Sequence, residues 1–507
     1  MKATKKNDKK MNILKKMINN SKIFSLETIE KVNSGHPGSV LSMSDIFYIF
    51  FQELIYDKND PKWINRDILI LSNGHLSIIL YLAFFIFNIK FKKKKIIEFI
   101  DIKNFRQKKS NCSGHPEFFK TIGIETTTGL LGQGLAIGIG MCLAVKWKKR
   151  FFNEKRKKIF NQKIIIFCGD GCLMEGVSYE ALSLAFNLNL NNIIINYDKN
   201  NITIDGNIKF FFRESIITRI KNLNFLIIII NHKEKIKNKL KKIERIKKNK
   251  KEKILFVICN TIIAKSSPNY NNKNSSHGKP LGYKEIFLIK TSLKWKFKKK
   301  LFINKCILSY NKKIISENNK IVKNIWNINI KKYKKNKKNW KILKKTENKD
   351  KIKNVKKLIK KIKEDVKETK IFSNKILNKI QKKIYNIVGG SADLENSTKF
   401  KIDKNIKNNI KFGVREISMS AITAGMSLMN LFTFNSTFLA FSDYLKPILR
   451  TSSMMKLTNL SIFTHDSFSI GEDGATHQPI EQLNCLRLIP NIMVFRPFNN
   501  FEIKTTW

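Results

Sequence analysis

"FCGDGCLMEGVSYE", residues 167–180, completes the apolar run Ile164–Phe167 and then sets Asp170 between two glycines. A short apolar run of this kind is typical of a buried parallel strand, and parallel sheets bind ligands beyond the carboxyl ends of their strands. Gly169 and Gly171 would let a ligand approach the backbone, while Asp170 offers an oxygen to a cation. The stretch therefore predicts a strand, a ligand-binding turn and then a helix.

Apolar runs and helical segments alternate along the rest of the chain, and this pattern predicts an α/β fold with two parallel-sheet domains. Helices are expected at Gly134–Lys146 and Tyr179–Asn187. The expected strands of the first domain are Ile68–Leu71, Ile164–Phe167, Ile193–Asn196 and Leu255–Cys259, and those of the second are Asn386–Gly390, Leu460–Thr464 and Ile492–Phe495.

Length and composition indicate a globular protein without a membrane segment. The 507 residues suggest about two to four domains, and the apolar fraction of 42% is ordinary for globular chains. No apolar run reaches transmembrane length, and the basic N-terminus lacks the features of a signal peptide. Seven cysteines, an odd number without regular spacing, argue against a disulfide framework. We expect a soluble, cytoplasmic protein with no membrane partner.

The formal net charge of +59 has two interpretations. One is nucleic-acid binding through phosphate contacts. The other is an AT-biased genome that inflates Lys, Asn, Ile and Phe at permissive sites. The second is favoured because the basic residues are mostly Lys, whereas bidentate recognition of phosphate and bases favours Arg. We therefore do not expect nucleic acid to be a partner.

A Lys- and Asn-rich stretch without glycine or proline lies between Gly282 and Gly389. It is typical of a domain tail, a linker and an amphipathic helical lead into the next domain. We predict a first domain over residues 1–320, a Lys-rich linker over 321–366 and a second domain over 367–507.

The histidines are concentrated in short polar segments that are rich in glycine. Six of the seven follow this pattern, and only His232 lies in nondescript surroundings. A lone histidine is more often structural than catalytic, but six in such segments indicate a site. The six are His36 in SGHPG, His75 in SNGH, His115 in SGHPE, His277 in SSHG, His465 in THDS and His477 in ATHQP.

Asp170 and the segment YDKNNITIDG suggest a cation site. Asn200 follows Asp170 by thirty residues, after the next predicted strand. A hard divalent cation takes a carboxylate, an amide oxygen and phosphate oxygens, and Ile202 could add its main-chain carbonyl. A diphosphate could then lie against the glycines and the following helix start. The alternative, a tight turn with a capping aspartate, is equally consistent with the GDG segment taken alone.

The ordered segments together resemble the transketolase family. They run nearly continuously from Val32 to Asn207, resume at Cys259–Ile286 and cover Gly389–Trp507. The GDG-to-Asn spacing resembles the family's thiamine-diphosphate motif. The other matching segments are NSGHPGSVLSMSDI, LSNGH, SGHPE, ETTTGLLGQG, SPN, SSHGKPLG, GGSADL, GVREISMSAI, STFLAFSDY and THDSFSIGEDGATHQPIEQ.

The resemblance implies a pyrophosphate-binding α/β domain followed by a pyrimidine-binding one, with thiamine diphosphate between them across the interface of a homodimer. It implies Mg²⁺, Ca²⁺ or another divalent cation on Asp170, Asn200 and Ile202. The positions that match the family's cofactor contacts are His75, Gly129, Leu130, Leu131, Gly171, Glu175, Asn200, His277, Asp393, Phe438, Phe441 and Tyr444.

The resemblance also assigns the chemistry. Glu416 of GVREIS matches the carboxylate that hydrogen-bonds the aminopyrimidine and helps generate the C2 carbanion, and burial would keep it partly protonated. A surface ion pair with Arg415 is the alternative. His36, His277 and His477 match catalytic positions, and sugar phosphates are expected at His36, His115, His277, Lys370, Ser397, His465, Asp473 and His477.

The implied reaction is a reversible ketol transfer of the pentose phosphate pathway. A two-carbon glycolaldehyde unit passes from a ketose phosphate such as xylulose 5-phosphate to an aldose phosphate such as ribose 5-phosphate. The implied class of enzyme is a transferase.

The chain departs from the family pattern at three places. Leu130 stands where the family usually has proline, and Lys370 stands at the position of a phosphate-binding arginine, with loss of its bidentate fork. The sequence also stops at Trp507, so we expect the family's third, C-terminal domain to be absent from this chain.

These departures leave rival interpretations open. The first is a working two-domain transketolase completed by a separate C-terminal-domain chain. The others are a deoxyxylulose-phosphate synthase, an inactive remnant, and a basic nucleic-acid-binding protein.

Overall fold

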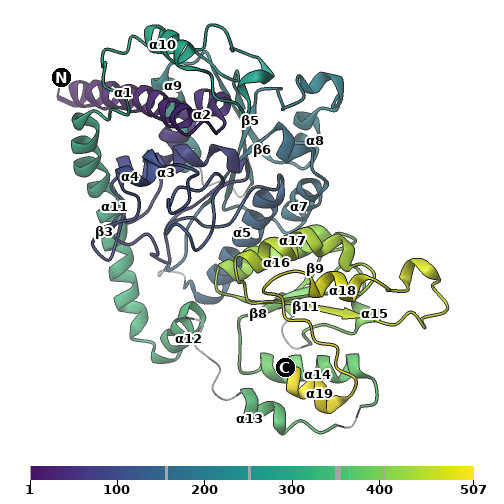
Figure 1. Cartoon of the computed structure of the whole chain (residues 1–507). Helices are drawn as coiled ribbons and strands as arrows, with labels where there is room; N and C mark the ends of the chain where they lie inside the picture. Colours follow the sequence, from purple (N-terminus) through teal and green to yellow (C-terminus); the bar gives the residue numbers. More distant parts are fainter. Residues whose placement is uncertain (1, 155–157, 249–252, 349–354, 365, 404–405) are drawn as a thin grey trace. The chain divides into compact units, whose positions relative to one another are not determined.

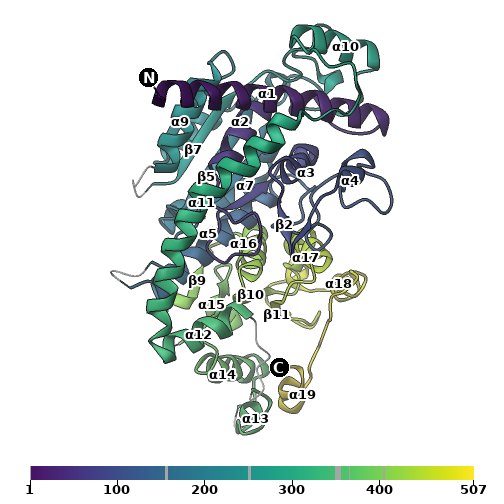
Figure 2. The ribbon, with the colours of Figure 1, turned by 90° about the vertical axis from the view of Figure 1, so that its left-hand side faces the viewer.

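The computed structural model describes the chain except for residues 1, 155–157, 249–252, 349–354, 365 and 404–405 (Figure 1). It divides into two compact units, one of residues 1–135 and 148–332 and the other of residues 136–147 and 333–507. Each unit contains one parallel sheet with helices packed on it, as the views in Figures 1 and 2 show. The predicted α/β class with two parallel sheets is confirmed.

The sheet of the first unit has five parallel strands in the order β1-β4-β5-β7-β6. The four predicted strands are present, three of them slightly longer than expected, and the sequence analysis missed β6. The strands are β1 (Ile68–Leu71), β4 (Ile164–Gly169), β5 (Ile193–Lys199), β6 (Leu226–Asn231) and β7 (Leu255–Asn260).

The core of the first unit contains rows of apolar side chains that lie opposite one another on neighbouring strands. Leu69, Ile165, Ile194 and Leu255 are register partners from strand to strand, and all four are buried. They pack with apolar side chains of the helices before and after the sheet in one hydrophobic cluster. Burial of such side chains contributes roughly 1.5–3 kcal/mol each, so the row fixes the strand register.

The helices of the first unit follow local sequence signals. Pro37 occupies the first turn of α2, where its missing N–H costs nothing. In α9, Leu240, Ile243 and Ile246 are buried at helical spacing among lysines. The helices are α1 (Lys2–Lys31), α2 (Pro37–Glu53), α3 (Ser77–Ile86), α4 (Phe99–Lys103), α6 (Asp170–Met174), α7 (Gly176–Asn187), α8 (Ile216–Asn222), α9 (Ile236–Lys248), α10 (Tyr283–Ser292) and α11 (Lys305–Lys334).

The first unit also contains a two-stranded ribbon, and it shares one helix with the second unit. A small antiparallel ribbon joins β2 (Lys90–Phe91) and β3 (Lys94–Lys95). Helix α5 (Gln133–Phe152) contributes residues to both units. The helices predicted at Gly134–Lys146 and Tyr179–Asn187 correspond to α5 and α7.

The sheet of the second unit has four parallel strands in the order β11-β10-β8-β9. The strands are β8 (Ile387–Ser391), β9 (Asn409–Lys411), β10 (Phe432–Phe438) and β11 (Asn459–Thr464). The helices are α12 (Lys337–Asn348), α13 (Val355–Lys360), α14 (Thr369–Gln381), α15 (Glu395–Thr398), α16 (Glu416–Leu428), α17 (Ser442–Met454), α18 (Gln482–Arg487) and α19 (Asn500–Thr506).

The strand predicted at Ile492–Phe495 is wrong. The segment has no regular secondary structure and pairs with no strand among the described residues. Met493 and Phe495 are 81% and 59% exposed, so the run lacks both the ladder partner and the burial that a strand needs. The following Arg496 instead donates to the carboxylate of Asp466 at 2.8 Å.

The Lys-rich stretch 321–366 is helical over much of its length. It contains the end of α11, then α12 and α13, while residues 349–354 and 365 lie outside the described part of the chain.

Two expectations from composition can be compared with the structure. None of the seven cysteines, all of which lie in the described part of the chain, forms a disulfide. Within the described residues, none of the helices combines the length and apolar character needed to cross a bilayer.

Candidate functional site

Four histidines of the first unit converge from four separate segments. His36 precedes α2, His75 lies in a 3₁₀ turn after β1, His115 lies in the SGHPE loop, and His277 follows a 3₁₀ turn at Asn274–Ser276. The ring centroid of His36 lies 5.1 Å from that of His75, 5.8 Å from that of His277 and 6.1 Å from that of His115. The structure thus brings together the four predicted site histidines of this unit.

These imidazoles are held in the neutral form. Burial lowers the pKa of His36 to about 3, with further contributions from Arg106 and the neighbouring histidines. Burial also lowers the pKa of His75, His115 and His277, and Arg106 adds to the effect at His75 and His115. Neutral imidazole can both donate and accept a proton, which suits proton transfer to and from substrate oxygens.

The sequence analysis missed Arg106, which contacts this cluster. Its guanidinium lies 3.1 Å from His36 Nδ1 and donates to Ser34 Oγ at 3.0 Å. The signal that could have found it is its residue type, since most basic residues of the chain are lysines.

The Asp170 carboxylate is buried where β4 ends and α6 begins. Oδ1 accepts a hydrogen bond from the Tyr197 hydroxyl at 2.5 Å, and Oδ2 accepts one from the Asn201 amide at 2.9 Å. Burial raises the pKa of Asp170 to about 6 despite these donors. A buried carboxylate whose charge is penalised in this way is a suitable ligand for a divalent cation.

Asn200 and Ile202 lie on the loop after β5, beside this carboxylate. Asn200 Oδ1 accepts from the Ile202 amide at 2.9 Å, and its Nδ2 donates to Asp198 Oδ2 at 3.1 Å. The described residues hold no group of three or more His, Cys, Asp or Glu side chains that could bind a metal. A cation on Asp170, Asn200 and the Ile202 carbonyl would therefore need further oxygens, which a diphosphate supplies.

The glycines of the GDG turn have different roles. A Cβ at Gly169 would meet open space, whereas a Cβ at Gly171 would lie 2.9 Å from Leu131. A Cβ at the adjoining Gly132, whose φ is +77°, would lie 2.8 Å from Glu175 Cβ. The predicted cofactor loop Gly129-Leu130-Leu131 is thus packed onto the GDG turn, and all three of its residues are exposed.

Buried polar atoms near the histidines fit a polar ligand. Asn73 is 1% exposed, and both of its amide atoms lack a partner within the described part of the chain. The same holds for Thr128 Oγ1 and His277 Nδ1. Leaving such groups unpaired costs free energy, so their gathering at the carboxyl edge of the sheet favours a bound molecule with its own donors and acceptors.

The second unit gathers the predicted aromatic residues with two histidines. Phe438 and Phe441 stack with centroids 5.6 Å apart, and Tyr444 lies 6.3 Å from Phe441. The centroid of His465 lies 3.9 Å from that of Phe438, and His477 lies 5.1 Å from Phe441. This cluster lies at the carboxyl ends of β10 and β11, and aromatic walls of this kind can stack on a planar ring.

The remaining predicted residues of this unit lie on the loops and helix starts around its sheet. Glu416 begins α16 and is half-buried, Ser397 lies in α15, and Asp393 is exposed with φ of +60°. Lys370 is half-buried and pairs with Glu368 at 3.6 Å. Burial lowers the pKa of His465, the charge of Lys370 lowers it further, and the charge of Asp473 opposes them.

Comparison with known proteins also identifies two domains in the chain. A family model described as "Transketolase, thiamine diphosphate binding domain" matches residues 13–352, and "Transketolase, pyrimidine binding domain" matches residues 367–507. The transketolase of Buchnera aphidicola subsp. Baizongia pistaciae is 36% identical over 516 residues, which cover 98% of this chain and 76% of that protein.

The structure is also similar to solved structures of transketolases. A crystal structure of transketolase from Campylobacter jejuni superposes with a TM-score of 0.89 at 34% identity, covering 98% of this chain and 76% of that one. Transketolase from Pichia stipitis, solved in complex with sedoheptulose 7-phosphate, has a TM-score of 0.90 at 31% identity and covers 97% of this chain and 74% of that one.

Fold and sites together define an α/β protein built from a thiamine-diphosphate-binding domain and a pyrimidine-binding domain. The chain belongs to the transketolase family.

Proposed function

We propose that the protein is a transketolase in activity as well as in family. It would transfer a two-carbon ketol unit reversibly from a ketose phosphate such as xylulose 5-phosphate to an aldose phosphate such as ribose 5-phosphate, as a transferase of the pentose phosphate pathway. The observation that carries this proposal is a cluster of four neutral histidines, in which the ring centroids of the other three lie 5.1–6.1 Å from that of His36. The same unit holds the buried Asp170.

The cofactor proposed for the site is thiamine diphosphate with Mg²⁺, Ca²⁺ or another divalent cation. Asp170, Asn200 and the Ile202 carbonyl would hold the cation, and the exposed loop Gly129-Leu130-Leu131 would border the diphosphate. When bound, the cofactor supplies a stabilised carbanion that can accept and release the ketol unit. The unpaired amide of Asn73 and the open space at Gly169 support the fit.

The chain's own residues would bind and orient the cofactor and the sugar, and they would exchange protons with both. The Glu416 carboxylate would hydrogen-bond the aminopyrimidine, and Phe438 and Phe441 would stack around it. His36, His277 and His477 would move protons at the carbonyl and hydroxyl oxygens of the sugar. Glu175 and Asp393 are assigned as further cofactor neighbours from the resemblance.

Substrate contacts are proposed for charged and polar groups of both units. Neutral histidines can hydrogen-bond sugar hydroxyls in either direction. A cation such as the Lys370 ammonium would attract the phosphate, and Asp473 would accept a hydrogen bond from a hydroxyl. The groups are His36, His115, His277, Lys370, Ser397, His465, Asp473 and His477.

We further propose a cytoplasmic homodimer with its active sites at the interface, and a separate C-terminal-domain chain as a partner to be tested. The proposed homodimer follows from the resemblance to the family, two of whose domain models match this chain.

An assay of ketol transfer tests the proposal. Purified protein would receive xylulose 5-phosphate and ribose 5-phosphate, with and without thiamine diphosphate and Mg²⁺, and formation of sedoheptulose 7-phosphate would be followed. Activity that depends on the cofactor is expected. Asp170→Ala should abolish cofactor retention, with Asp205→Ala, an exposed loop carboxylate, as the control. Unchanged activity of Asp170→Ala would contradict the cation assignment.

The inactive-remnant alternative predicts a different outcome. A folded chain that neither binds thiamine diphosphate nor transfers the ketol unit, alone or with a C-terminal-domain chain, would favour it. Salt-sensitive RNA binding without thiamine dependence would favour the nucleic-acid alternative.

A further inference from the structure

The guanidinium of Arg106 contacts two residues of the segment that precedes α2. Nη2 lies 3.1 Å from His36 Nδ1, and Nη1 donates to Ser34 Oγ at 3.0 Å. The planar fork of arginine therefore spans the turn that carries His36, and a lysine ammonium cannot reproduce this two-pronged geometry.

Contacts within its own loop hold Arg106 in place. Its backbone has a φ of +64°, which is uncommon for a residue with a side chain, and its amide donates to the Cys112 carbonyl at 2.9 Å. A Cβ at Gly114 would lie 3.1 Å from Arg106 Nε, so the glycine before His115 leaves room for the guanidinium. These contacts hold the guanidinium against His36.

The direction of the hydrogen bond follows from the chemistry of the two groups. A guanidinium carries only donors, so His36 Nδ1 has to accept. A neutral imidazole with an accepting Nδ1 carries its proton on Nε2. We propose that Arg106 is a positioning residue that fixes His36 in the Nε2–H tautomer and sets the orientation of its ring.

The residues around the Nε2 edge of the His36 ring indicate where this proton points. A Cβ at Gly278 would lie 3.8 Å from both His36 Nε2 and Cδ2, so the Nε2 edge faces the SSHGK loop. The rings of His75 and His277 lie 5.1 and 5.8 Å from His36. The fixed N–H is thus available as a donor to an oxygen bound among the histidines.

The consequence for catalysis rests on the proposed function. His36 would enter each turnover as a hydrogen-bond donor with no population of the opposite tautomer. Without Arg106, both tautomers become accessible and the ring loses one restraint. We expect Arg106→Met to lower kcat/KM for the ketose donor by at least about tenfold, a part of the 10²–10⁴-fold typical of acid–base groups. Arg106→Lys should restore part of this loss.

The tautomer can be measured without activity. NMR of protein with ¹³C- and ¹⁵N-labelled histidine gives resonances from only seven residues, and His36→Gln assigns the one of interest. In wild-type protein at pH 7.5, His36 should show a protonated Nε2 and an unprotonated Nδ1. In Arg106→Met the two nitrogens should shift toward averaged values, while the melting temperature stays close to that of wild type.

Controls separate this inference from the proposed function. Arg245→Met, at an exposed arginine of α9, should change neither the tautomer nor the kinetics. A wild-type His36 that is protonated on Nδ1, or a tautomer unchanged by Arg106→Met, overturns the inference. If wild-type protein shows the expected tautomer but transfers no ketol unit, the positioning role stands and the proposed function fails.

Discussion

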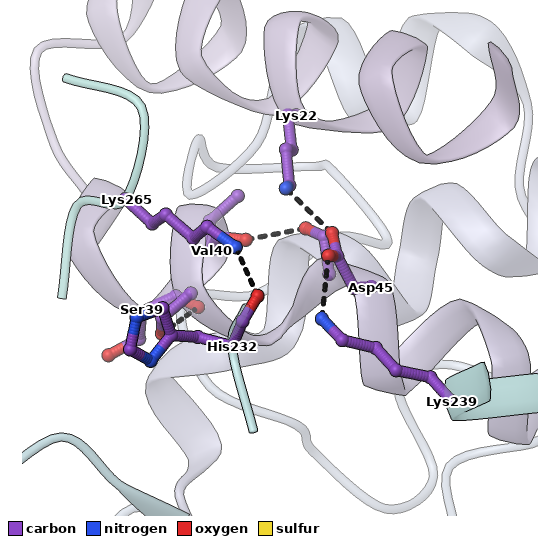
Figure 3. Close-up of polar contacts among 9 residues, drawn as sticks. Lys22, Ser39, Val40, Asp45, His232, Lys239 and Lys265 are labelled. Atoms are coloured by element: carbon purple, nitrogen blue, oxygen red, sulfur yellow. Dashed lines mark hydrogen bonds and ion pairs between the residues drawn. The ribbon is translucent and has the colours of Figure 1, made fainter. Parts of the chain in front are cut away.

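Lys22 Nζ lies 2.7 Å from Asp45 Oδ1, and Lys239 Nζ approaches the other carboxylate oxygen at 3.1 Å (Figure 3). Lys22 and Lys239 are 4% and 2% exposed. Burial opposes ionisation of Asp45, but the two lysines outweigh it and hold the pKa of that carboxyl well below its ordinary value. One carboxylate on α2 therefore compensates two buried cations, one on α1 and one on α9.

Asp45→Asn should destabilise the first unit strongly. The substitution leaves two ammonium groups buried without a counter-charge, and breaking a buried ion pair costs about 3–5 kcal/mol. Chemical unfolding followed by tryptophan fluorescence would measure the loss. Glu244→Gln is the matched control, because Glu244 pairs with Lys10 between the same helices α1 and α9 but near the surface. Its effect should stay within about 1 kcal/mol.

The lowered pKa of His36 predicts a pH dependence of stability. In the unfolded chain this histidine takes up a proton near pH 6.5, but in the folded chain only near pH 3. The unfolded state therefore binds more protons between these values, and the folded state loses stability as pH falls through this window. At pH 5 the loss due to His36 should reach about 2 kcal/mol.

Comparison with His36→Gln isolates this effect from other titrating groups. The wild type and the variant would be unfolded at pH 7.5 and pH 5.0. The wild type should lose more stability than the variant between the two conditions. Equal losses would mean that His36 is not held neutral in the folded state.

Gly390→Ala tests the close strand pairing of the GGSADL segment. A Cβ at Gly390 would lie 1.9 Å from the carbonyl oxygen of Ile410 on the neighbouring strand β9. The strands would have to separate, and overpacking of this kind costs about 1–3 kcal/mol or more. Thermal unfolding would report a lowered melting temperature. Gly471→Ala, where an added Cβ meets nothing within 4 Å, should have little effect on it.

Tyr197→Phe tests the support of the Asp170 carboxylate. Its hydroxyl donates to Oδ1 at 2.5 Å, and its loss should leave the carboxylate less well oriented for a cation. We expect the Kd for thiamine diphosphate with Mg²⁺ to rise about 10- to 100-fold, as for other partners of metal ligands. Titration followed by fluorescence would measure this change. Tyr179→Phe, which removes a hydroxyl bound to Glu214, should leave the Kd unchanged.

Continuous apolar runs made four strands of the first sheet predictable, although the run LIIIIN of β6, which is only partly buried, was missed. The runs at β1, β4, β5 and β7 begin with successive apolar residues that are buried on both faces, so they stand out from their surroundings. Strand β10, FTFNSTF, did not, because its interior holds the polar Asn435, Ser436 and Thr437. Asn435 is accommodated by donating to Thr423 Oγ1 at 3.0 Å, a tertiary contact without a local signal.

In the candidate site, too, some residues have a local sequence signal and others depend on tertiary contacts. Histidines and glycines are rare in this chain, so their segments could be found from the sequence. The role of Tyr197 could not be predicted, because its hydroxyl acts through one contact made by the fold, with Asp170. Arg106 differs in residue type from most basic residues of the chain, but its contact with His36 is likewise made only by the fold. A single tyrosine resembles the many other aromatic residues, which make up 11% of the chain.

Substitutions of Lys370 test the proposed phosphate site, where the resemblance to the family implies an arginine. Lys370→Arg should restore a bidentate contact and lower the KM for xylulose 5-phosphate by about tenfold, since charged hydrogen bonds contribute about 1.5–3 kcal/mol. Lys370→Met should raise the KM by a similar factor. Hydroxypyruvate carries no phosphate, so its KM should change with neither substitution. Lys382→Arg, at an exposed lysine directly after α14, is the control. A common change for both donors would place Lys370 outside the phosphate site and leave its charge to act on His465, whose pKa it already lowers.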